Sequence, residues 1–91
     1  MSVRATIAQK LTEAFTPLSL EVEDESDRHQ GHAGHREGGE THFRVYIVAE
    51  AFRGKSRIDR HRMINATLAS ELAGSVHALA IHAQAPGEAG R

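Results

Sequence analysis

The chain has 91 residues, a length that suits one small domain with a modest core. It contains no cysteine, which excludes disulfides and thiolate metal ligands from this chain, so that a metal would have to be held by histidine or carboxylate. Its net charge of −1 excludes a globally basic polyanion binder and leaves only a local basic patch for that role. No apolar run approaches a membrane span or a signal peptide, so we expect a cytoplasmic protein with no membrane partner.

The first predicted element is a helix that Ser2 can cap and that Pro17 ends, because the residue before proline is pushed out of helical geometry. Its apolar stripe consists of Val3, Ile7, Leu11 and Phe15. Residues 18–25 then alternate, which predicts a strand with one solvated side. Leu18, Leu20 and Val22 share the face expected to be buried, and Ser19, Glu21 and Glu23 share the other.

Residues 27–40 show no periodicity and contain four glycines, which predicts a long loop. A second strand is predicted over residues 42–49, with Phe43, Val45 and Ile47 on the core face. A basic connector over residues 51–60 follows, with a turn at Gly54.

Residues 60–83 are predicted to form a helix, a glycine stop and a strand. Ile64, Leu68 and Leu72 recur on one helical face, and Gly74 stands where a left-handed terminal residue is needed. The last strand, over residues 76–83, places His77 on the same side as the core residues Leu79 and Ile81. Residues 84–91 are predicted to be a flexible tail with no core residues, so the domain is assigned to residues 1–83.

This order of elements predicts an α+β sandwich of α-β-β-α-β type, in which helices cover one face of a three-stranded sheet. Four segments together resemble the BolA family: LEVEDES, ETHFRVYIV, FRGKSRIDRHRMINATLASEL and VHALAIHA. The resemblance covers nearly the whole chain. It implies a class II KH-like fold with a mixed sheet, in which the third strand runs parallel to the second.

The resemblance also implies a partnership with monothiol glutaredoxins, in which a [2Fe–2S] cluster is shared and glutathione supplies a further thiolate. In that family the BolA protein contributes a histidine at the VHALAI position, which is His77 here. A second ligand comes from the loop between the first two strands. Counting forward from Asp24-Glu25-Ser26 selects His29, counting back from the ETHF segment points nearer His32, and His35 ranks third.

Plainer interpretations exist for each histidine. His77 on its own would be a core-edge residue bonded to backbone. His82 is expected on the opposite face as a solvated residue, and His42 as a structural residue on the polar face. The loop histidines could also be a solvated tract that takes up divalent metal, but a glycine-rich loop does not pre-order the fixed ligand set of a zinc site.

The connector and helix carry a basic patch with Asp59 as its only nearby counter-charge. The patch consists of Arg53, Lys55, Arg57, Arg60 and Arg62. It is either a solvated connector, a surface for glutathione or a glutaredoxin, or a weak DNA-binding site. KH domains grip nucleic acid through a GXXG loop, but the turn here reads GKSR, so close approach to phosphates is not favoured.

The sequence contains no paired carboxylates in a credible pocket, no nucleophile with supporting motifs and no phosphate-binding glycine loop, so we expect no enzyme. The preferred hypothesis is a glutaredoxin partner that co-ligates a [2Fe–2S] cluster for cluster trafficking or iron and redox sensing. We expect the isolated chain to bind no cofactor tightly and to be a monomer or weak homodimer. The alternative is a DNA-binding transcriptional regulator that uses the basic patch, and metal storage by the loop ranks last.

Overall fold

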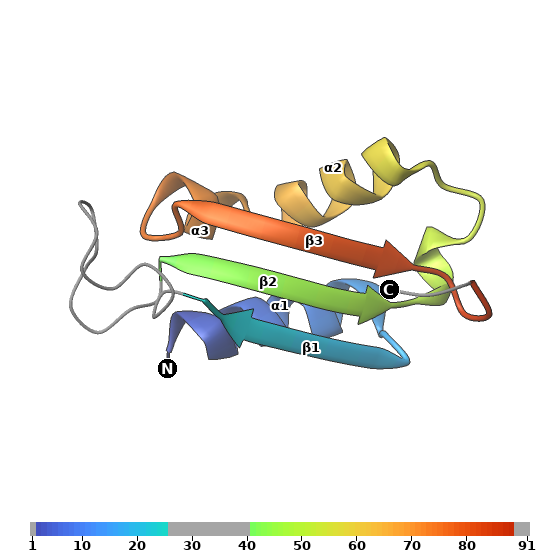
Figure 1. Cartoon of the computed structure of the whole chain (residues 1–91), viewed down its shortest axis with the longest axis horizontal. Helices are drawn as coiled ribbons and strands as arrows, with labels where there is room; N and C mark the ends of the chain where they lie inside the picture. The colour runs from blue at the N-terminus through green and yellow to red at the C-terminus, as the bar shows by residue number, and fades with distance from the viewer. Residues whose placement is uncertain (1, 26–40, 89–91) are drawn as a thin grey trace.

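The computed structural model describes residues 2–25 and 41–88. Their elements, in chain order, are α1 (Val3–Phe15), β1 (Ser19–Asp24), β2 (His42–Val48), the 3-10 helix η2 (Glu50–Phe52), α2 (Arg57–Thr67), α3 (Ala69–Ala73) and β3 (Ala78–Gln84) (Figure 1). The predicted loop of residues 27–40, with His29, His32 and His35, lies outside the described residues.

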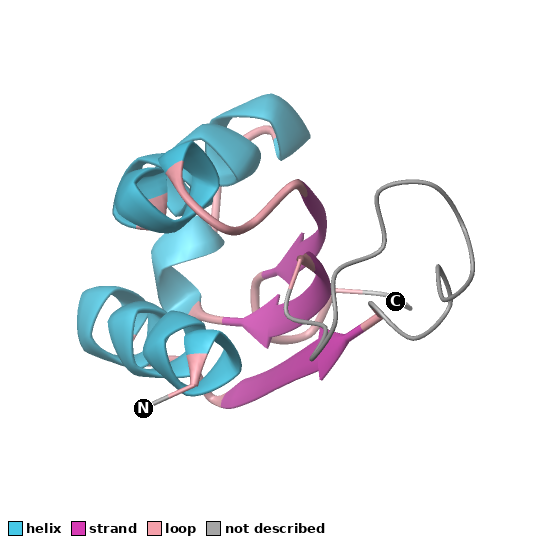
Figure 2. Cartoon of the chain, turned by 90° about the vertical axis from the view of Figure 1, so that its left-hand side faces the viewer, coloured by secondary structure: helices cyan, strands magenta, loops and turns pink. Residues whose placement is uncertain are grey.

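The strands form one sheet in the order β1-β2-β3. β1 pairs antiparallel with β2, and β2 pairs parallel with β3 in a register that sets Phe43 beside Leu79. The helices lie on one side of this sheet, and no helix of the described residues covers its other face, which we call the open face (Figure 2). The predicted α+β architecture and mixed sheet are therefore confirmed.

The core lies between the sheet and the helices. α1 begins where the Ser2 hydroxyl accepts a hydrogen bond from the Ala5 N–H (3.0 Å), and it buries Ile7 and Leu11 completely. From the sheet, the alternating residues Phe43, Val45 and Ile47 are buried as predicted. Further buried residues are Val22, Ala49, Phe52, Ile64, Leu68, Val76 and Ala85.

Leu18 was expected on the buried face, but its side chain is 73% exposed. The strand begins one residue later, and Leu18 lies in a bend after the turn that ends α1. The alternation of faces holds only within the paired strand, so it does not extend to this residue.

The second helical stretch also differs from prediction. α2 begins at Arg57, because the Ser56 hydroxyl caps it by accepting a hydrogen bond from the Asp59 N–H (3.1 Å). The helix ends at Thr67, whose hydroxyl donates to the Met63 carbonyl (3.0 Å), a back-bond that often bends helices. Leu68 then leaves helical geometry (φ −103°, ψ 21°) and separates α3 from α2.

Residues 84–88 are held to the domain by the strand pairing, one buried residue and an ion pair, so the predicted flexible tail is wrong for this part of the chain. Gln84 belongs to β3, and Ala85 is only 1% exposed. Glu88 receives two hydrogen bonds from the Arg60 guanidinium (2.7 and 2.8 Å) and one from the Ala85 N–H (2.9 Å). The bonds from Arg60 and from the Ala85 backbone lower the pKa of Glu88 to about 2.

The difference in exposure between Leu11 and Leu18 predicts two different mutational costs. Leu11→Ala should lower the free energy of unfolding by about 2–5 kcal/mol, because it leaves a cavity in the core. Leu18→Ala, the matched control, should change it by about 0.5 kcal/mol or less. Urea denaturation followed by circular dichroism measures both values, and equal losses would contradict the placement of Leu18.

The lowered pKa of Glu88 predicts a pH-dependent contribution to stability. A depressed carboxylate pKa stabilises the fold above the ordinary value of 4.5, and this stabilisation is lost as the pH falls toward about 2. Glu88→Gln should therefore be less stable than the natural chain at neutral pH, and the deficit should shrink over that range. Urea titrations at stepped pH measure the deficit, with Glu13→Gln on exposed α1 surface as control. A deficit that stays constant down to pH 2 would contradict this account.

Candidate functional site

His77 lies directly before β3 and is exposed to solvent. The backbone there is held because both the His77 N–H (2.7 Å) and the Ala78 N–H (3.3 Å) donate to the Thr41 carbonyl. The expectation of a core-edge histidine is therefore wrong. The paired strand begins only at Ala78. Val76 is buried in the core, whereas the next residue, His77, is exposed to solvent.

His42, at the start of β2, is the nearest histidine neighbour of His77 among the described residues. The two ring centroids are 6.2 Å apart and the rings meet edge to face (74°). The Nδ1 atom of His42 shares a hydrogen bond with the Thr41 hydroxyl (2.8 Å), which fixes the ring and turns Nε2 away from that contact. His42 was expected to be a structural residue, and its proximity to His77 was not predicted, although the two histidines stand at the starts of two strands predicted to be parallel neighbours.

The same end of the sheet carries both attachment points of the long predicted loop. The Glu25 N–H, just after β1, donates to the His42 carbonyl (2.8 Å). Thr41, just before β2, accepts a hydrogen bond from the His77 N–H, so both ends of the predicted loop lie near His77. His29, His32 and His35 lie between these two points in the sequence and outside the described residues.

Two histidine side chains lie close together at this end of the sheet. Within residues 2–25 and 41–88 there is no group of three histidine or acidic side chains that could hold a metal ion. His77 and His42 supply two imidazoles, and the chain has no thiolate. An exposed imidazole on a fixed backbone fits one ligand position of an iron–sulfur cluster whose other ligands come from elsewhere.

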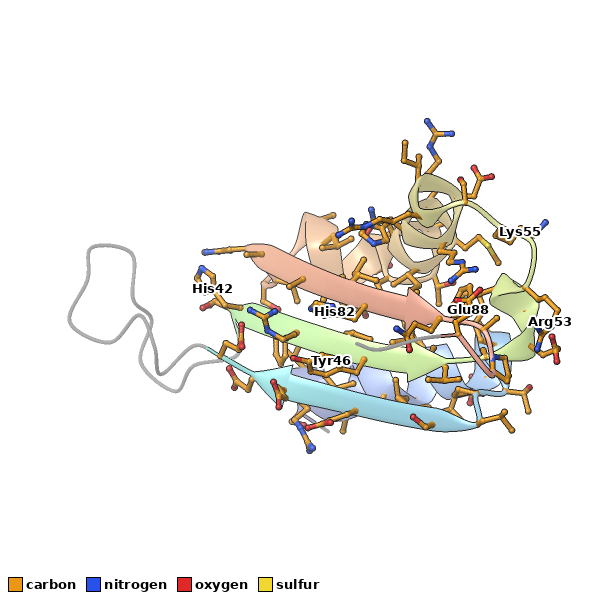
Figure 3. All side chains as sticks on the ribbon, turned by 45° about the vertical axis from the view of Figure 1, so that its right-hand side comes forward. His42, Tyr46, Arg53, Lys55, His82 and Glu88 are labelled. Atoms are coloured by element: carbon orange, nitrogen blue, oxygen red, sulfur yellow. The ribbon has the colours of Figure 1, made fainter. Side chains whose placement is uncertain are left out.

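His82 was expected to be a solvated residue, but it is half-buried on the open face of the sheet. Its ring stacks on Tyr46 of the neighbouring strand, with centroids 4.7 Å apart and planes at 18° (Figure 3). Its Nε2 atom lies 3.1 Å from an Arg44 nitrogen. Arg44 in turn donates to Glu25 (2.9 Å), a bond that raises the pKa of the guanidinium.

The basic patch is not a set of five unpaired charges, contrary to the expectation that only Asp59 opposes it. Arg60 is paired with Glu88 and also donates to the Ala83 carbonyl (3.0 Å). Arg53 is paired with Glu50, which lowers the pKa of that carboxyl. The weakest pair joins Arg62 to Asp59 at 3.9 Å, with both side chains exposed.

Lys55 and Arg57 are the two members of the patch that form no ion pair with the part of the chain described. Both line a cleft of about 540 Å³ between the start of α2 and the end of β3. The other lining residues are Arg60, His61, Ile81, His82, Ala83, Gln84 and Glu88. In Figure 3, Lys55, Glu88 and His82 mark this region.

No helix among the described residues is both long and apolar enough to cross a membrane. A model of the BolA-like protein family matches residues 11–88. A Sinorhizobium protein described as an uncharacterized protein in the cobS 5' region is 53% identical over 97% of this chain and 96% of its own length. The DNA-binding transcriptional regulator BolA of Escherichia coli K12 is 50% identical over 90% of this chain and 74% of its own.

The solved structures agree with these relatives. The BolA domain of SufE1 from Arabidopsis thaliana has a TM-score of 0.86 and 46% identity, with 98% of each chain covered. BolA1 from the same plant has a TM-score of 0.87 and 36% identity, with 99% of this chain and 98% of that chain covered. The family match spans most of the chain and the fold is that of these domains, so the chain belongs to the BolA-like protein family.

Proposed function

We propose that this protein is a non-enzymatic partner of a monothiol glutaredoxin and co-ligates a [2Fe–2S] cluster through His77, for cluster trafficking or for iron and redox sensing. The observation that carries the proposal is the exposed His77, held by the Thr41 carbonyl beside His42 and beside both attachment points of the histidine-bearing loop. The family resemblance supplies the identity of the partner.

The protein's own residues have defined tasks in this proposal. The cluster, when bound, would accept or donate an electron, or would itself be passed to another protein. His77 offers an imidazole nitrogen, and its backbone anchoring reduces the entropy lost when the ligand is fixed. Because the chain has no cysteine, the thiolates come from the glutaredoxin and from glutathione, and replacement of thiolate by imidazole raises the reduction potential.

The second ligand is proposed to be His29, with His32 next and His35 third. His29 is the fourth residue after Glu25, whose N–H is fixed to β2. Each further residue that must be ordered costs about 1–2 kcal/mol, so the histidine with the shortest tether to a fixed strand is favoured. His42 is an additional candidate, because its ring already lies near that of His77.

DNA binding is the second candidate function. It is favoured by the Escherichia coli relative, whose name describes a DNA-binding transcriptional regulator, and by Lys55 and Arg57, which form no ion pair within the described residues. Three of the five patch charges are already opposed by carboxylates, so few phosphates would be neutralised. Binding through this patch should therefore be weak and steeply dependent on salt.

The shared cluster is tested by anaerobic mixing of this protein with a holo monothiol glutaredoxin and glutathione, followed by visible absorption and circular dichroism. We expect a spectrum distinct from that of the glutaredoxin alone. His77→Ala should abolish that spectrum and leave the urea midpoint nearly unchanged, because the side chain is exposed.

His82→Ala is the matched control, because His82 lies on the open sheet face and stacks on Tyr46. It should keep the heterodimer spectrum. If mixing leaves the glutaredoxin spectrum unchanged, or if His77→Ala retains the new spectrum, the proposal is wrong.

The second ligand is identified by titrating four single variants, His29→Ala, His32→Ala, His35→Ala and His42→Ala, with the holo glutaredoxin. We expect the largest loss of the heterodimer signal for His29→Ala. A wild-type response of His29→Ala together with loss in another variant would reassign the ligand to that residue without affecting the role of His77.

A further inference from the structure

We propose that the outer edge of β3 binds an extended acidic peptide of a partner protein, which adds to the sheet as a fourth strand. This inference goes beyond the cluster-binding role and does not depend on it, because it concerns the other end of β3. It rests on the hydrogen-bonding pattern of the strand, on the charges of the adjoining cleft and on the residues that line it.

The register shows which backbone groups of β3 point outward. The Ala78 N–H bonds to Thr41 and the Gln84 carbonyl accepts from Ala49, so the even-numbered residues of β3 bond to β2. The N–H and C=O groups of Ile81 and Ala83 therefore face away from the sheet. The Ala83 carbonyl accepts from Arg60 (3.0 Å), which confirms this direction.

Part of this edge is left without a partner among the described residues. Both backbone groups of Ile81 and the N–H of Ala83 remain available where β3 borders the cleft. A row of available edge groups is a template for another strand, and proteins commonly bind extended peptides in this way. The cleft beside the edge, about 540 Å³, gives room for such a segment.

The charges beside the edge select an acidic segment. Lys55 and Arg57 line the cleft without a counter-charge in the described chain, and His61 also lines it. The one carboxylate in the lining, Glu88, is already neutralised by Arg60. Carboxylates on alternate residues of an added strand would therefore meet the two unpaired cations.

The lining favours a peptide over single-stranded nucleic acid. Nonspecific binding of single strands uses aromatic platforms for the bases, and among the described residues the aromatic side chains that line this cleft are two histidines, of which His82 is already stacked on Tyr46. Tyr46 is on the open face, where it stacks on His82, and Phe43 and Phe52 are buried in the core. Main-chain groups, in contrast, are what an extended peptide requires.

The test uses the full chain and the fluorescein-labelled peptide Glu-Val-Glu-Thr-Glu-Val-Glu-Thr, followed by fluorescence polarisation at low salt. Arg57→Glu should weaken binding about tenfold or more, because it replaces attraction by repulsion. Arg62→Glu is the matched control, since Arg62 is on the same helix but outside the cleft, and it should have little effect. Amide NMR signals of Ile81 and Ala83 should shift when the peptide is added.

Two N-methylated versions of the peptide separate strand addition from simple charge attraction. Methylation of one alternate set of amides should abolish binding, and methylation of the other set should not, because only one set faces β3. Equal binding of both versions overturns the proposal, as does equal weakening by the two arginine variants. Tighter Arg57-dependent binding of a single-stranded oligonucleotide, or full displacement by equimolar inorganic phosphate, overturns it as well.

Discussion

The parallel pairing of β2 with β3 is the constraint on which both candidate sites depend. It joins segments that are far apart in the chain, with His42 set beside Ala78 at one end and Val48 beside Gln84 at the other. At the first end this pairing places His77 next to the Thr41 carbonyl and 6.2 Å from the ring of His42. At the second end it carries Ala85 into the core and Glu88 to Arg60.

The two ends are separated by the length of a seven-residue strand, roughly 20 Å at about 3.3 Å per residue. This distance exceeds the screening length of surface charges at physiological salt, which is about 8 Å. A charge change at the Lys55–Arg57 cleft should therefore have little direct electrostatic effect at His77.

The sequence predicted the parts of the fold that depend on local pattern. The alternation of Phe43, Val45 and Ile47 and the stripe of Ile7 and Leu11 each correspond to one physical periodicity, and both packed as expected. Local pattern could not predict the ion pair between Arg60 and Glu88, because these residues are distant in the sequence and meet only when the end of β3 lies beside α2. For the same reason the basic patch was predicted to have too few counter-charges, and residues 84–88 were predicted to be unpacked.

In the candidate site, too, the sequence predicted one residue but not the contacts that depend on distant segments. Sequence resemblance pointed to His77, but its exposure and its neighbour His42 follow from the register between two distant strands and from where the pairing begins. This exposure has a physical consequence for how function and stability are related. A buried ligand histidine would leave a cavity when replaced, whereas His77 is exposed and its backbone N–H donates to the Thr41 carbonyl, a bond that every residue except proline can make. The fold therefore anchors this position through a backbone bond that a substitution of the side chain keeps, so the ligand role of the imidazole can be tested separately from the stability of the fold.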